Sequence, residues 1–409
     1  MPPKSLALFT AGFPFGNGET FLETELPFLA ETFGQLTLFP ANAVGALRAV
    51  PPNAVVSDIM SRKTWQVTTF GAATAATLQL WRHGGAEFRR SMLTSQRGVA
   101  LNAIFRWAMA LIKCEAALAW WAKSTVGERF VYSYWGGPAT VAAALMPHLD
   151  AKIFCRVHRV DLYEEETALR FIPFLPYVLA SCDRIFAISD HGRSYVTGKF
   201  PTLTSRTEVS RLGVTGGSIH HRQSKSEIFY VLTCSTLEPQ KRPLLLADCI
   251  FSLARDLPNR RFRWVHFGTG SMQREFASFL NNSPHNLDHD WKGVRANSDV
   301  RSFMMSEPID VFLNLSQSEG LPVSIMEAMA SGIPVMATDV GGTREIVDNL
   351  NGWLLSDHPK VGTVVAALKD AMSDRGKLKK KGVLAHSTWK QKYDANTNYP
   401  QFCQSVIKL

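Results

Sequence analysis

The stretch SEGLPVSIMEAMASGIPVMATDVGG, residues 318–342, decides the fold. It follows an expected strand at 310–316, passes through a glycine-containing loop into a helix, and leads to a second apolar strand at 333–339. Such a strand-to-helix turn exposes backbone N–H groups and the positive end of a helix, an arrangement that binds phosphate without a dedicated cation. Strand, helix and strand in this order predict a parallel-sheet α/β domain.

Two carboxylates lie eight positions apart in this stretch, Glu319 in the loop and Glu327 in the helix. A carboxylate about one turn into the helix is placed to accept hydrogen bonds from the vicinal hydroxyls of a ribose. An alternative is that Ser324 and Glu327 form a Ser-x-x-Glu capping box, in which the Glu satisfies backbone N–H groups and binds no ligand. The segment alone does not separate these two interpretations.

The same alternation of strands and helices extends along the chain. The clearest expected strands are LALFTAGF, AKIFCRVH, RIFAIS, FYVLTCS, RWVHFGTG, DVFLNLS and IPVMATD. A chain of 409 residues is too long for one ordinary core, and the polar, Gly- and Ser-rich stretch 215–226 has the composition of a linker. We therefore expect domains at 1–214 and 227–385, with an aromatic helical tail, 386–409, completing the first.

Composition narrows the class of protein. A hydrophobic content of 46% with 19% charged residues is typical of a globular enzyme and excludes a disordered or fibrous chain. The six cysteines are scattered without a Cys-x-x-Cys pair, which favours reduced core thiols. The amino terminus resembles a first strand more than a signal sequence, so we expect a cytosolic protein.

The net charge of +9 is unevenly distributed. Between Ala41 and Thr125 there are ten Lys or Arg residues against three Asp or Glu residues. This excess suits an anionic membrane surface, a phosphorylated acceptor or nucleic acid, or it is a solvated face. Because no nucleic-acid recognition motif accompanies it, we do not expect nucleic-acid binding.

The apolar stretch Val99–Trp121 is long enough to span a bilayer, but charged residues interrupt its middle, so a spanning helix is not expected. An amphipathic helix here would instead dock on the membrane, with Trp107, Trp120 and Trp121 at the interface. The charge for such docking would come from Arg89, Arg90 and Arg97. The alternative is an ordinary packed domain helix.

In its context, the segment 318–342 resembles the Glu-(seven residues)-Glu signature of retaining glycosyltransferases of family 4. As in that family, DVGGTREIV and then NGWLL follow it. Further matches occur in order across nearly the whole chain. The resemblance implies the GT-B fold, two Rossmann-like parallel-sheet α/β domains facing across a cleft, with the acceptor on the amino-terminal domain and the nucleotide sugar on the carboxy-terminal one.

The resemblance also implies roles in the second domain. Glu319 would lie by the donor sugar and Glu327 would bind the ribose. The backbone that would hold the diphosphate comprises Gly320, Leu321, Pro322, Val323 and Ser324. Recognition of the base would fall near Val294 and Arg295.

The segment CSTLEPQKRP resembles the family loop that carries an Arg and, five residues on, a Lys on the diphosphate. Lys241 matches the Lys, whereas Thr236 occupies the Arg position. A missing guanidinium removes an electrostatic stabiliser of the leaving group, and Arg242 is a candidate substitute.

In the first domain, TAGFPFGNGETFLETELPFLAETF resembles the family's first strand and glycine-rich loop. Gly16 would let the backbone approach the diphosphate, while Asn17, Gly18 and Glu19 would face the acceptor. The alternative is an ordinary turn, with Glu19 capping the next helix.

The strand AKIFCRVH ends at His158, and RVDLYEEE follows. This resembles the His-x-x-Asp-Leu-Tyr segment of the polysaccharide-building branch of the family, in which the His contacts the donor sugar. Arg159 and Val160 stand where a smaller Gly is usual, which changes the shape of the pocket. The alternative is a structural His with its hydrogen bonds satisfied.

Together these matches imply retaining transfer of a hexose from a UDP- or GDP-linked donor to a saccharide hydroxyl, with Glu319, His158 and Lys241 as catalytic residues. The acceptor would be lipid-linked and belong to exopolysaccharide, capsule or lipopolysaccharide biosynthesis. No cofactor and no metal are expected, because Asp288-His289-Asp290, the one Asp-x-Asp, lies in a polar stretch that we predict to be a surface turn. The alternative function is a non-catalytic protein that binds nucleotide sugar or an anionic surface.

Overall fold

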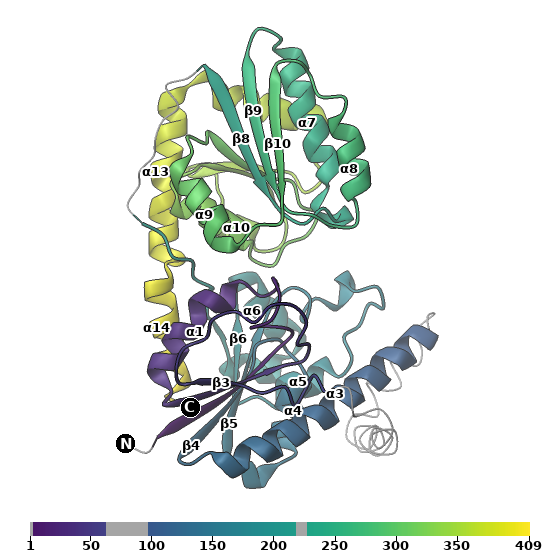
Figure 1. Cartoon of the computed structure of the whole chain (residues 1–409), viewed down its shortest axis with the longest axis vertical. Helices are drawn as coiled ribbons and strands as arrows, with labels where there is room; N and C mark the ends of the chain where they lie inside the picture. The colour runs from purple at the N-terminus through teal and green to yellow at the C-terminus, as the bar shows by residue number, and fades with distance from the viewer. Residues whose placement is uncertain (1–2, 63–96, 218–226) are drawn as a thin grey trace. The chain divides into compact units, whose positions relative to one another are not determined.

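The computed structural model describes residues 3–62, 97–217 and 227–409. The chain forms two compact units, the first comprising Met1–Arg211 with Tyr399–Leu409 and the second Leu212–Asn398 (Figure 1). Within the described residues, each unit is built on one parallel β-sheet. The predicted α/β class with two parallel-sheet domains is therefore confirmed, and their facing across a cleft stays a prediction.

The sheet of the first unit has the strand order β3-β2-β1-β4-β5-β6-β7. Its strands are β1 (Lys4–Thr10), β2 (Gln35–Pro40), β3 (Ala54–Val56), β4 (Glu128–Ser133), β5 (Ala151–Val157), β6 (Arg184–Ala187) and β7 (Thr207–Val209). The α-helices with it are α1 (Phe21–Thr32), α3 (Arg97–Ser124), α4 (Pro138–Ala144), α5 (Leu175–Ala180), α6 (Asp190–Lys199) and α14 (Ala395–Val406), the last of which begins in the second unit.

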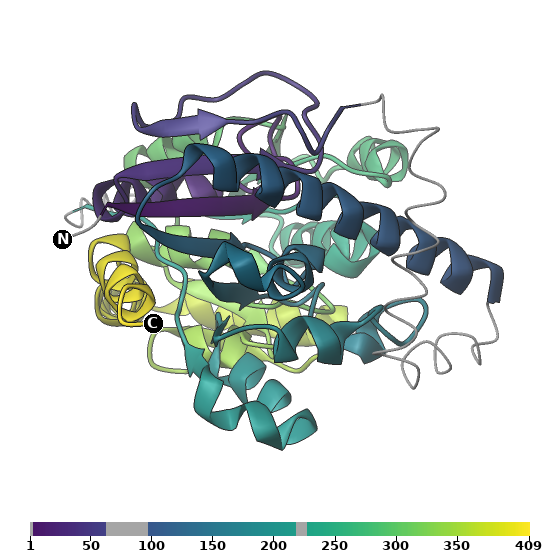
Figure 2. The same cartoon turned by 90° about the horizontal axis from the view of Figure 1, so that it is seen from below.

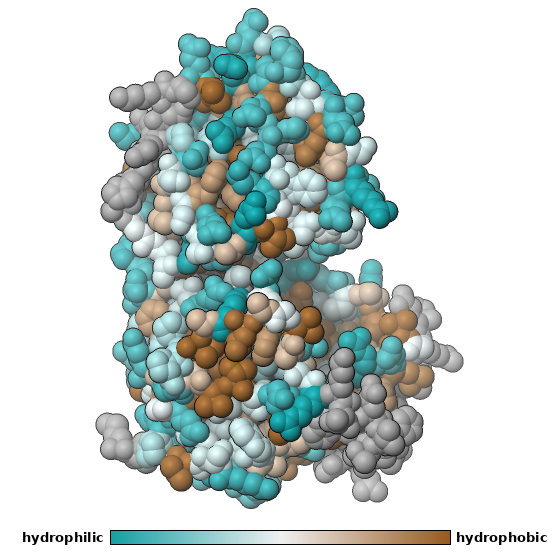
Figure 3. Space-filling view, viewed as in Figure 1, coloured by the Kyte–Doolittle hydropathy of each residue, from teal (hydrophilic) through white to brown (hydrophobic). Residues whose placement is uncertain are grey.

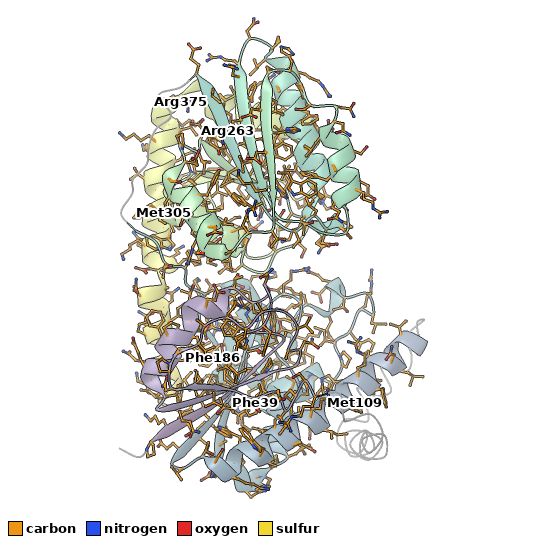
Figure 4. All side chains as sticks on the ribbon, in the orientation of Figure 1. Phe39, Met109, Phe186, Arg263, Met305 and Arg375 are labelled. Atoms are coloured by element: carbon orange, nitrogen blue, oxygen red, sulfur yellow. The ribbon has the colours of Figure 1, made fainter. Side chains whose placement is uncertain are left out.

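Helices cover both faces of this sheet. Successive side chains of a strand point to opposite faces, so neighbouring residues of one strand enter different cores. Phe9 of β1 belongs to the core that includes α3, whereas Leu8 belongs to the core that includes α1 and the end of α14. In Figure 2 the long blue helix α3 lies against the strands. Figure 4 shows Phe39 and Phe186 among the side chains that fill the unit; Phe39 stacks on Phe9 with ring centroids 4.9 Å apart.

The aromatic tail divides between the two cores. Trp389 and Tyr393 are buried in the second unit, where the Trp389 indole donates to the carbonyl of Val214 at 3.2 Å. Tyr399 and Phe402 are buried in the first unit. We expected the whole segment 386–409 to complete the first unit. This segment is too long, since residues 386–398 pack in the second unit.

The second unit has the strand order β10-β9-β8-β11-β12-β13. Its strands are β8 (Ile228–Cys234), β9 (Arg261–Phe267), β10 (Leu287–Gly293), β11 (Val311–Asn314), β12 (Val335–Thr338) and β13 (Gly352–Leu355). Its α-helices are α7 (Pro243–Asp256), α8 (Gln273–Leu280), α9 (Asn297–Ser306), α10 (Val323–Ala330), α11 (Thr343–Ile346), α12 (Val361–Ser373) and α13 (Arg375–Lys392).

Helices lie on both faces of this sheet as well. Trp264 of β9 packs edge-on against Phe276 of α8, whereas Phe267 of the same strand packs against Phe303 of α9. Arg375, labelled in Figure 4, forms an ion pair with Asp310. All six cysteines are free, as predicted, and Cys234 alone among them is not fully buried.

The predicted surface turn at Asp288-His289-Asp290 is wrong, because these residues lie in strand β10. Asp288 pairs with Arg263 of β9, and Asp290 pairs with Val265. β10 is the edge strand, where polar side chains reach solvent and hide the strand pattern. Within the described ranges, no group of three or more His, Cys, Asp or Glu side chains is placed to hold a metal ion.

The predicted linker begins with residues that are fixed on the second unit. The guanidinium of Arg301 donates to the Thr215 hydroxyl at 2.6 Å, and a Cβ on Gly216 would lie 2.6 Å from the Trp389 ring. The chain therefore leaves the first unit at Arg211, earlier than the sequence indicated. The rest of the predicted linker, 218–226, lies outside the described residues.

Helix α3 corrects part of the membrane-docking prediction. Trp121 is fully buried and Trp107 packs on Phe174 with ring centroids 4.6 Å apart, so of the three Trp residues only Trp120 is exposed, at 43%. Arg89, Arg90 and the side chain of Arg97 lie outside the described part of the chain. Among the described residues, none of the helices combines the length and the apolar character needed to cross a bilayer.

Apolar surface nevertheless occurs on the first unit, as Figure 3 shows. Its exposed apolar side chains include Val44 and Leu47 after β2. Val99, Leu101 and Trp120 of α3 are exposed as well. Trp120, although exposed, also packs edge-on against Phe39, with ring centroids 6.2 Å apart.

Candidate functional site

Each sheet has a switch point, where the strand order reverses and ligands of open parallel sheets bind. In the first unit it lies between β1 and β4, and in the second between β8 and β11. The loops that follow these strands contain the predicted residues Glu19, Lys241 and Glu319. The topology thus places candidate residues of both units at the edge of the sheet where a ligand is expected.

Lys241 and Glu319 form an ion pair in the second unit. The Lys241 ammonium Nζ lies 2.6 Å from Glu319 Oε1, joining the loop after β8 to the loop after β11. Asn314, the last residue of β11, directs its amide Nδ2 toward the same oxygen at 3.4 Å. Glu319 is only 7% exposed, so the pair lies in a partly desolvated place where such interactions are strong.

The double glycine of DVGG supports the Glu319 loop from behind. A Cβ on Gly341 would lie 1.8 Å from the carbonyl oxygen of Glu319, and Gly341 has a φ of +52°. The N–H of Gly342 donates to the carbonyl of Gly320 at 2.9 Å. The loop therefore needs glycine at 341 for both space and backbone conformation.

Glu327 is not part of a capping box. Helix α10 begins at Val323 after Pro322, so Ser324 is already its second residue, and no side chain caps the helix. Glu327 is 5% exposed, and its Oε1 accepts a hydrogen bond from Asn297 Nδ2 at 2.6 Å. The capping alternative is therefore wrong, and the ribose-binding role stays a prediction.

Burial sets the charge of Glu327. Desolvation raises the pKa of its carboxyl to about 7, against the opposing effects of the Asn297 hydrogen bond and the nearby positive charge of Arg301. The group therefore titrates near neutral pH. A ligand that donates hydrogen bonds to it would favour the ionised form.

The start of α10 has the features of an anion site. The N–H groups of Val323 and Ser324 lie in the first turn and have no acceptor within the helix. Pro322 has no N–H to offer. The other four predicted backbone positions, Gly320, Leu321, Val323 and Ser324, have N–H groups for which the described residues provide no hydrogen-bond acceptor.

The remaining predicted residues of the second unit, Thr236, Val294 and Arg242, make no contact with Glu319 or Glu327 in the hydrogen bonds that the structure describes. Thr236 is exposed in the loop after β8, and Val294, directly after β10, is 48% exposed. Arg242 precedes α7 as its N-cap residue, with a φ of +50°, and its guanidinium donates to the carbonyl of Asp357 at 2.7 Å. The guanidinium of Arg242 is therefore engaged with a backbone carbonyl, and its substitution for the missing family Arg stays a prediction.

The glycine-rich loop of the first unit follows β1. Gly16 has a φ of +65°, and a Cβ there would lie 2.9 Å from the carbonyl of Val44, so this position requires glycine. Gly18 has open space in the direction of a Cβ, and Asn17 is exposed. These two residues are accessible, and nothing else in the structure ties them to an acceptor.

Glu19 is bound to its own loop. Its carboxylate accepts hydrogen bonds from the backbone N–H groups of Ala11, Gly12 and Phe13 at 3.0, 2.7 and 2.7 Å, and from Trp135 Nε1 at 2.6 Å. Helix α1 has no side-chain cap, so the alternative that Glu19 caps this helix is wrong. Because the Glu19 carboxylate already accepts four hydrogen bonds, it has little capacity left for the predicted contact with an acceptor.

His158 directly follows β5 and is 7% exposed. Its ring packs among Phe21, Tyr134 and Trp135, with centroid distances of 6.1, 5.0 and 4.4 Å. Neither ring nitrogen has a hydrogen-bond partner among the described residues, and Nδ1 lies 3.9 Å from Asp161 Oδ2. His158 is therefore not a structural His whose ring nitrogens have their hydrogen bonds satisfied within the described residues.

Sequence reasoning missed Asn297, Trp135 and Asp161 as members of the site. Asp161 stood within the quoted segment RVDLYEEE, so its position after a strand was a usable signal. Trp135 follows β4, a strand that the apolar pattern did not single out. Asn297 begins a polar helix and reaches Glu327 only through the tertiary fold.

One family model matches residues within the second unit. Residues 219–383 match the family model described as "Glycosyl transferases group 1". The putative colanic acid biosynthesis glycosyltransferase WcaL of Salmonella typhimurium is 29% identical over 237 residues, which cover 54% of this chain and 56% of WcaL. The O-antigen biosynthesis glycosyltransferase WbnH of Escherichia coli is 39% identical over 131 residues, which are 32% of this chain and 34% of WbnH. The chain thus spans little more than half the length of WcaL.

Similar solved structures cover both units. HepE of Anabaena in complex with UDP has a TM-score of 0.67 at 17% identity, covering 99% of this chain and 100% of HepE. The lipopolysaccharide outer core galactosyltransferase WaaB has a TM-score of 0.67 at 16% identity, with coverage of 99% and 100%. Sucrose-phosphate synthase of Thermosynechococcus elongatus has a TM-score of 0.69 at 11% identity, with coverage of 99% and 98%. At these identities the similarity establishes the GT-B type of fold.

Proposed function

We propose that this chain, whose residues 219–383 match the group 1 glycosyltransferases, transfers a sugar from a nucleoside-diphosphate donor to a saccharide hydroxyl. The observation that carries the proposal is the Lys241–Glu319 ion pair, 2.6 Å long, at the switch point of the second sheet. Glu327 lies on the helix that follows Glu319 in the chain. Relatives named for colanic acid and O-antigen biosynthesis support a role in surface polysaccharide assembly.

In this proposal the donor diphosphate lies at the amino end of α10. Lys241 and the first-turn N–H groups stabilise the negative charge that grows as the bond to the anomeric carbon breaks. The electron pair of that bond leaves with the diphosphate, and an acceptor oxygen forms the new bond. Its proton passes to the departing phosphate, and the anomeric configuration is retained, as the family 4 resemblance implies.

The ribose and the sugar have separate partners in this proposal. The ribose hydroxyls donate to Glu327, whose other neighbour, Asn297, holds Oε1 at 2.6 Å. A sugar hydroxyl supplies the hydrogen-bond partner that the buried His158 ring lacks within the described residues. Because Lys241 and a helix end supply positive charge, the proposed reaction needs no metal ion and no cofactor.

Finer features of the proposal rest on the sequence resemblance. They are a hexose donor linked to UDP or GDP, a lipid-linked acceptor in exopolysaccharide, capsule or lipopolysaccharide assembly, and peripheral attachment to the inner face of the cell membrane. The similar HepE structure is a complex with UDP, which favours a UDP-linked donor here.

A thermal-shift panel tests the proposal. UDP, GDP, ADP and their common sugars are added to the wild type, to Glu327→Ala and to Glu275→Ala, a control in which an exposed carboxylate of α8 is removed. A ligand at a hundredfold excess over its Kd stabilises the native state by about 2.7 kcal/mol. We expect one nucleotide class to raise the melting temperature of the wild type and the control but not of Glu327→Ala.

Two other outcomes would count against the proposal. If no nucleotide shifts the wild type, a protein that binds an anionic surface becomes the better description. If nucleotides bind but neither transfer nor hydrolysis of the donor is detected, the non-catalytic nucleotide-sugar binder is favoured.

A further inference from the structure

Two carboxylates, the partly buried Glu19 and the buried Asp161, fasten together three loops at the carboxyl edge of the first sheet. These loops, 11–20 after β1, 134–137 after β4 and 158–163 after β5, are called the platform below. Glu19 joins the first loop to the second through its hydrogen bond from Trp135 Nε1. Asp161 joins the second to the third, because it accepts the N–H of Gly136 at 2.6 Å and the N–H of His158 at 2.7 Å.

The bonding capacity of Glu19 is filled. An ionised carboxylate offers about four lone-pair sites. Three backbone N–H groups and the Trp135 indole occupy them at 2.6–3.0 Å. A sugar hydroxyl would have to displace one of these donors, so the side chain is placed to hold the protein and not a substrate.

A second side chain holds the same loop from its other side. Arg48 donates through Nη2 to the carbonyl of Gly18 at 2.5 Å and through Nε to that of Pro14 at 3.3 Å. Its guanidinium also lies over the Phe13 ring, 4.6 Å from the centroid. Two side chains therefore hold the loop, and Glu19 alone links it to the rest of the platform through a side-chain hydrogen bond that the structure describes.

The centre of the platform is the contact between Trp135 and His158. The centroids of the two rings lie 4.4 Å apart. Packing and the Asp161 carboxylate, 3.9 Å from Nδ1, hold the His158 ring, since its nitrogens have no hydrogen-bond partner among the described residues. A ring held mainly by packing moves when the neighbouring ring moves. The position of Trp135, and with it that of His158, therefore depends on the carboxylate of Glu19.

We propose that Glu19 and Asp161 are positioning residues that fix Trp135 and His158 for contact with the sugar that is transferred. The inference rests on the proposed function, in which His158 meets a sugar hydroxyl. In this inference Glu19 does not bind the acceptor directly. It acts on the sugar through the rings of Trp135 and His158. Neither carboxylate touches the substrate.

The first experiment tests the geometry without any activity. Protein labelled with ¹⁵N-tryptophan is compared as wild type, Glu19→Gln, and Glu31→Gln, a control that changes an exposed carboxyl at the end of α1. The Trp135 indole signal is assigned by its loss in Trp135→Phe. We expect Glu19→Gln to move this signal and Glu31→Gln to leave it in place; an unmoved signal in Glu19→Gln would overturn the inference.

The second experiment measures turnover. The probe is the nucleotide sugar, among UDP-glucose, UDP-galactose, UDP-N-acetylglucosamine and GDP-mannose, that stabilises the wild type most, and the readout is release of free nucleoside diphosphate. Because a displacement of about 1 Å at a reacting centre can cost a hundredfold, we expect Glu19→Gln and Asp161→Asn to lower kcat about ten- to a hundredfold. The Kd of the free nucleoside diphosphate should stay within about twofold, since its proposed partners are in the second unit.

A double-mutant cycle shows whether Glu19 acts through His158. If it does, Glu19→Gln has little further effect in a His158→Ala background, whereas independent effects multiply. Multiplied effects, or a Glu19→Gln protein with wild-type kcat, would overturn the inference and leave the proposed function intact. A wild type that binds no nucleotide would instead refute the proposed function and this inference with it. Should Glu19→Gln fail to fold, Trp135→Phe, which removes the indole donor and reduces the ring that packs on His158, is tested in the same cycle.

Discussion

Lys241 Nζ and Glu319 Oε1 lie 2.6 Å apart, although the two residues are separated by 78 positions in the chain. The sheet topology explains the contact, because β8 and β11 are neighbours and each is followed by one of the two loops. Glu319 holds the ammonium at the edge where a ligand of this sheet is expected. A diphosphate bound there would share the Lys241 charge with Glu319.

Removal of the Lys241 charge tests this arrangement. We expect Lys241→Met to lower turnover of the donor about a hundred- to a thousandfold, the usual effect of losing one electrostatic stabiliser of the transition state. The measurement is steady-state release of nucleoside diphosphate. Lys369→Met is the matched control, because it removes an exposed pair with Asp256, and its turnover should equal that of the wild type. Equal turnover in both variants would remove Lys241 from the proposed mechanism.

The backbone contact behind Glu319 gives a second prediction. In Gly341→Ala the new Cβ would lie 1.8 Å from the Glu319 carbonyl at a φ of +52°, so the Glu319 loop must move. We expect a loss of about 1–3 kcal/mol of unfolding free energy, together with reduced nucleotide affinity. Gly362→Ala is the control, since open space surrounds this glycine of α12 and Ala favours a helix by about 1 kcal/mol. Denaturant unfolding and the thermal shift by UDP measure both effects; a Gly341→Ala protein as stable as the wild type would contradict this account.

Strands buried on both faces could be predicted from the sequence, because they appear as continuous apolar runs. FYVLTCS, which became β8, is such a run. The edge strand β10 could not be predicted in this way, since Asp288, His289, Asp290 and Lys292 interrupt its apolar pattern. Strands β3 and β7 are only three residues long. A pattern of three residues carries too little periodicity for a prediction.

The candidate site was predictable where a local motif carried it. Glu319 and Glu327 lie within one strand-loop-helix segment, so their spacing along the chain placed them in the predicted loop and helix, and their roles stay predictions. Trp135 bonds Glu19 from 116 positions away and Asn297 bonds Glu327 from 30 positions away. Such partners are set by strand order and helix packing, which single-sequence patterns do not specify. For the same reason Glu19 was expected to face an acceptor, although its carboxylate faces its own loop.

The raised pKa of Glu327 makes stability depend on pH. Its folded-state pKa of about 7 exceeds the usual value of 4.5, so the folded state holds a proton that the unfolded state has lost between these two values. The stabilisation from this proton is complete below pH 4.5 and is lost as the pH rises toward 7, a change on the order of 3 kcal/mol. Glu327→Gln, which cannot ionise, should lack this loss.

Chemical denaturation of the two proteins between pH 5 and pH 7.5 measures the difference. We expect the unfolding free energy of the wild type to fall relative to that of Glu327→Gln as the pH rises to about 7. Above this pH the difference should stay constant. Parallel curves would show that Glu327 ionises at its usual pKa. Asp310→Asn provides a comparison, because burial raises the pKa of Asp310 to about 6 at a position outside the candidate site.

The return of the chain to the first unit depends on a buried ion pair. Arg156 and Glu25 are both fully buried, with Arg156 Nη2 lying 3.2 Å from Glu25 Oε1. The same guanidinium donates to the Ser210 carbonyl at 2.7 Å and lies over the Phe402 ring, 4.3 Å from its centroid. Arg156→Met leaves the Glu25 charge buried without its partner, so we expect a loss of about 3–5 kcal/mol of unfolding free energy. Replacing both partners, in Glu25→Leu with Arg156→Met, should recover much of this loss, because no uncompensated charge then remains. Urea unfolding measures both variants. A double variant no more stable than Arg156→Met would show that the hydrogen bond to Ser210 and the contact with Phe402, and not the charge of Glu25, account for the loss.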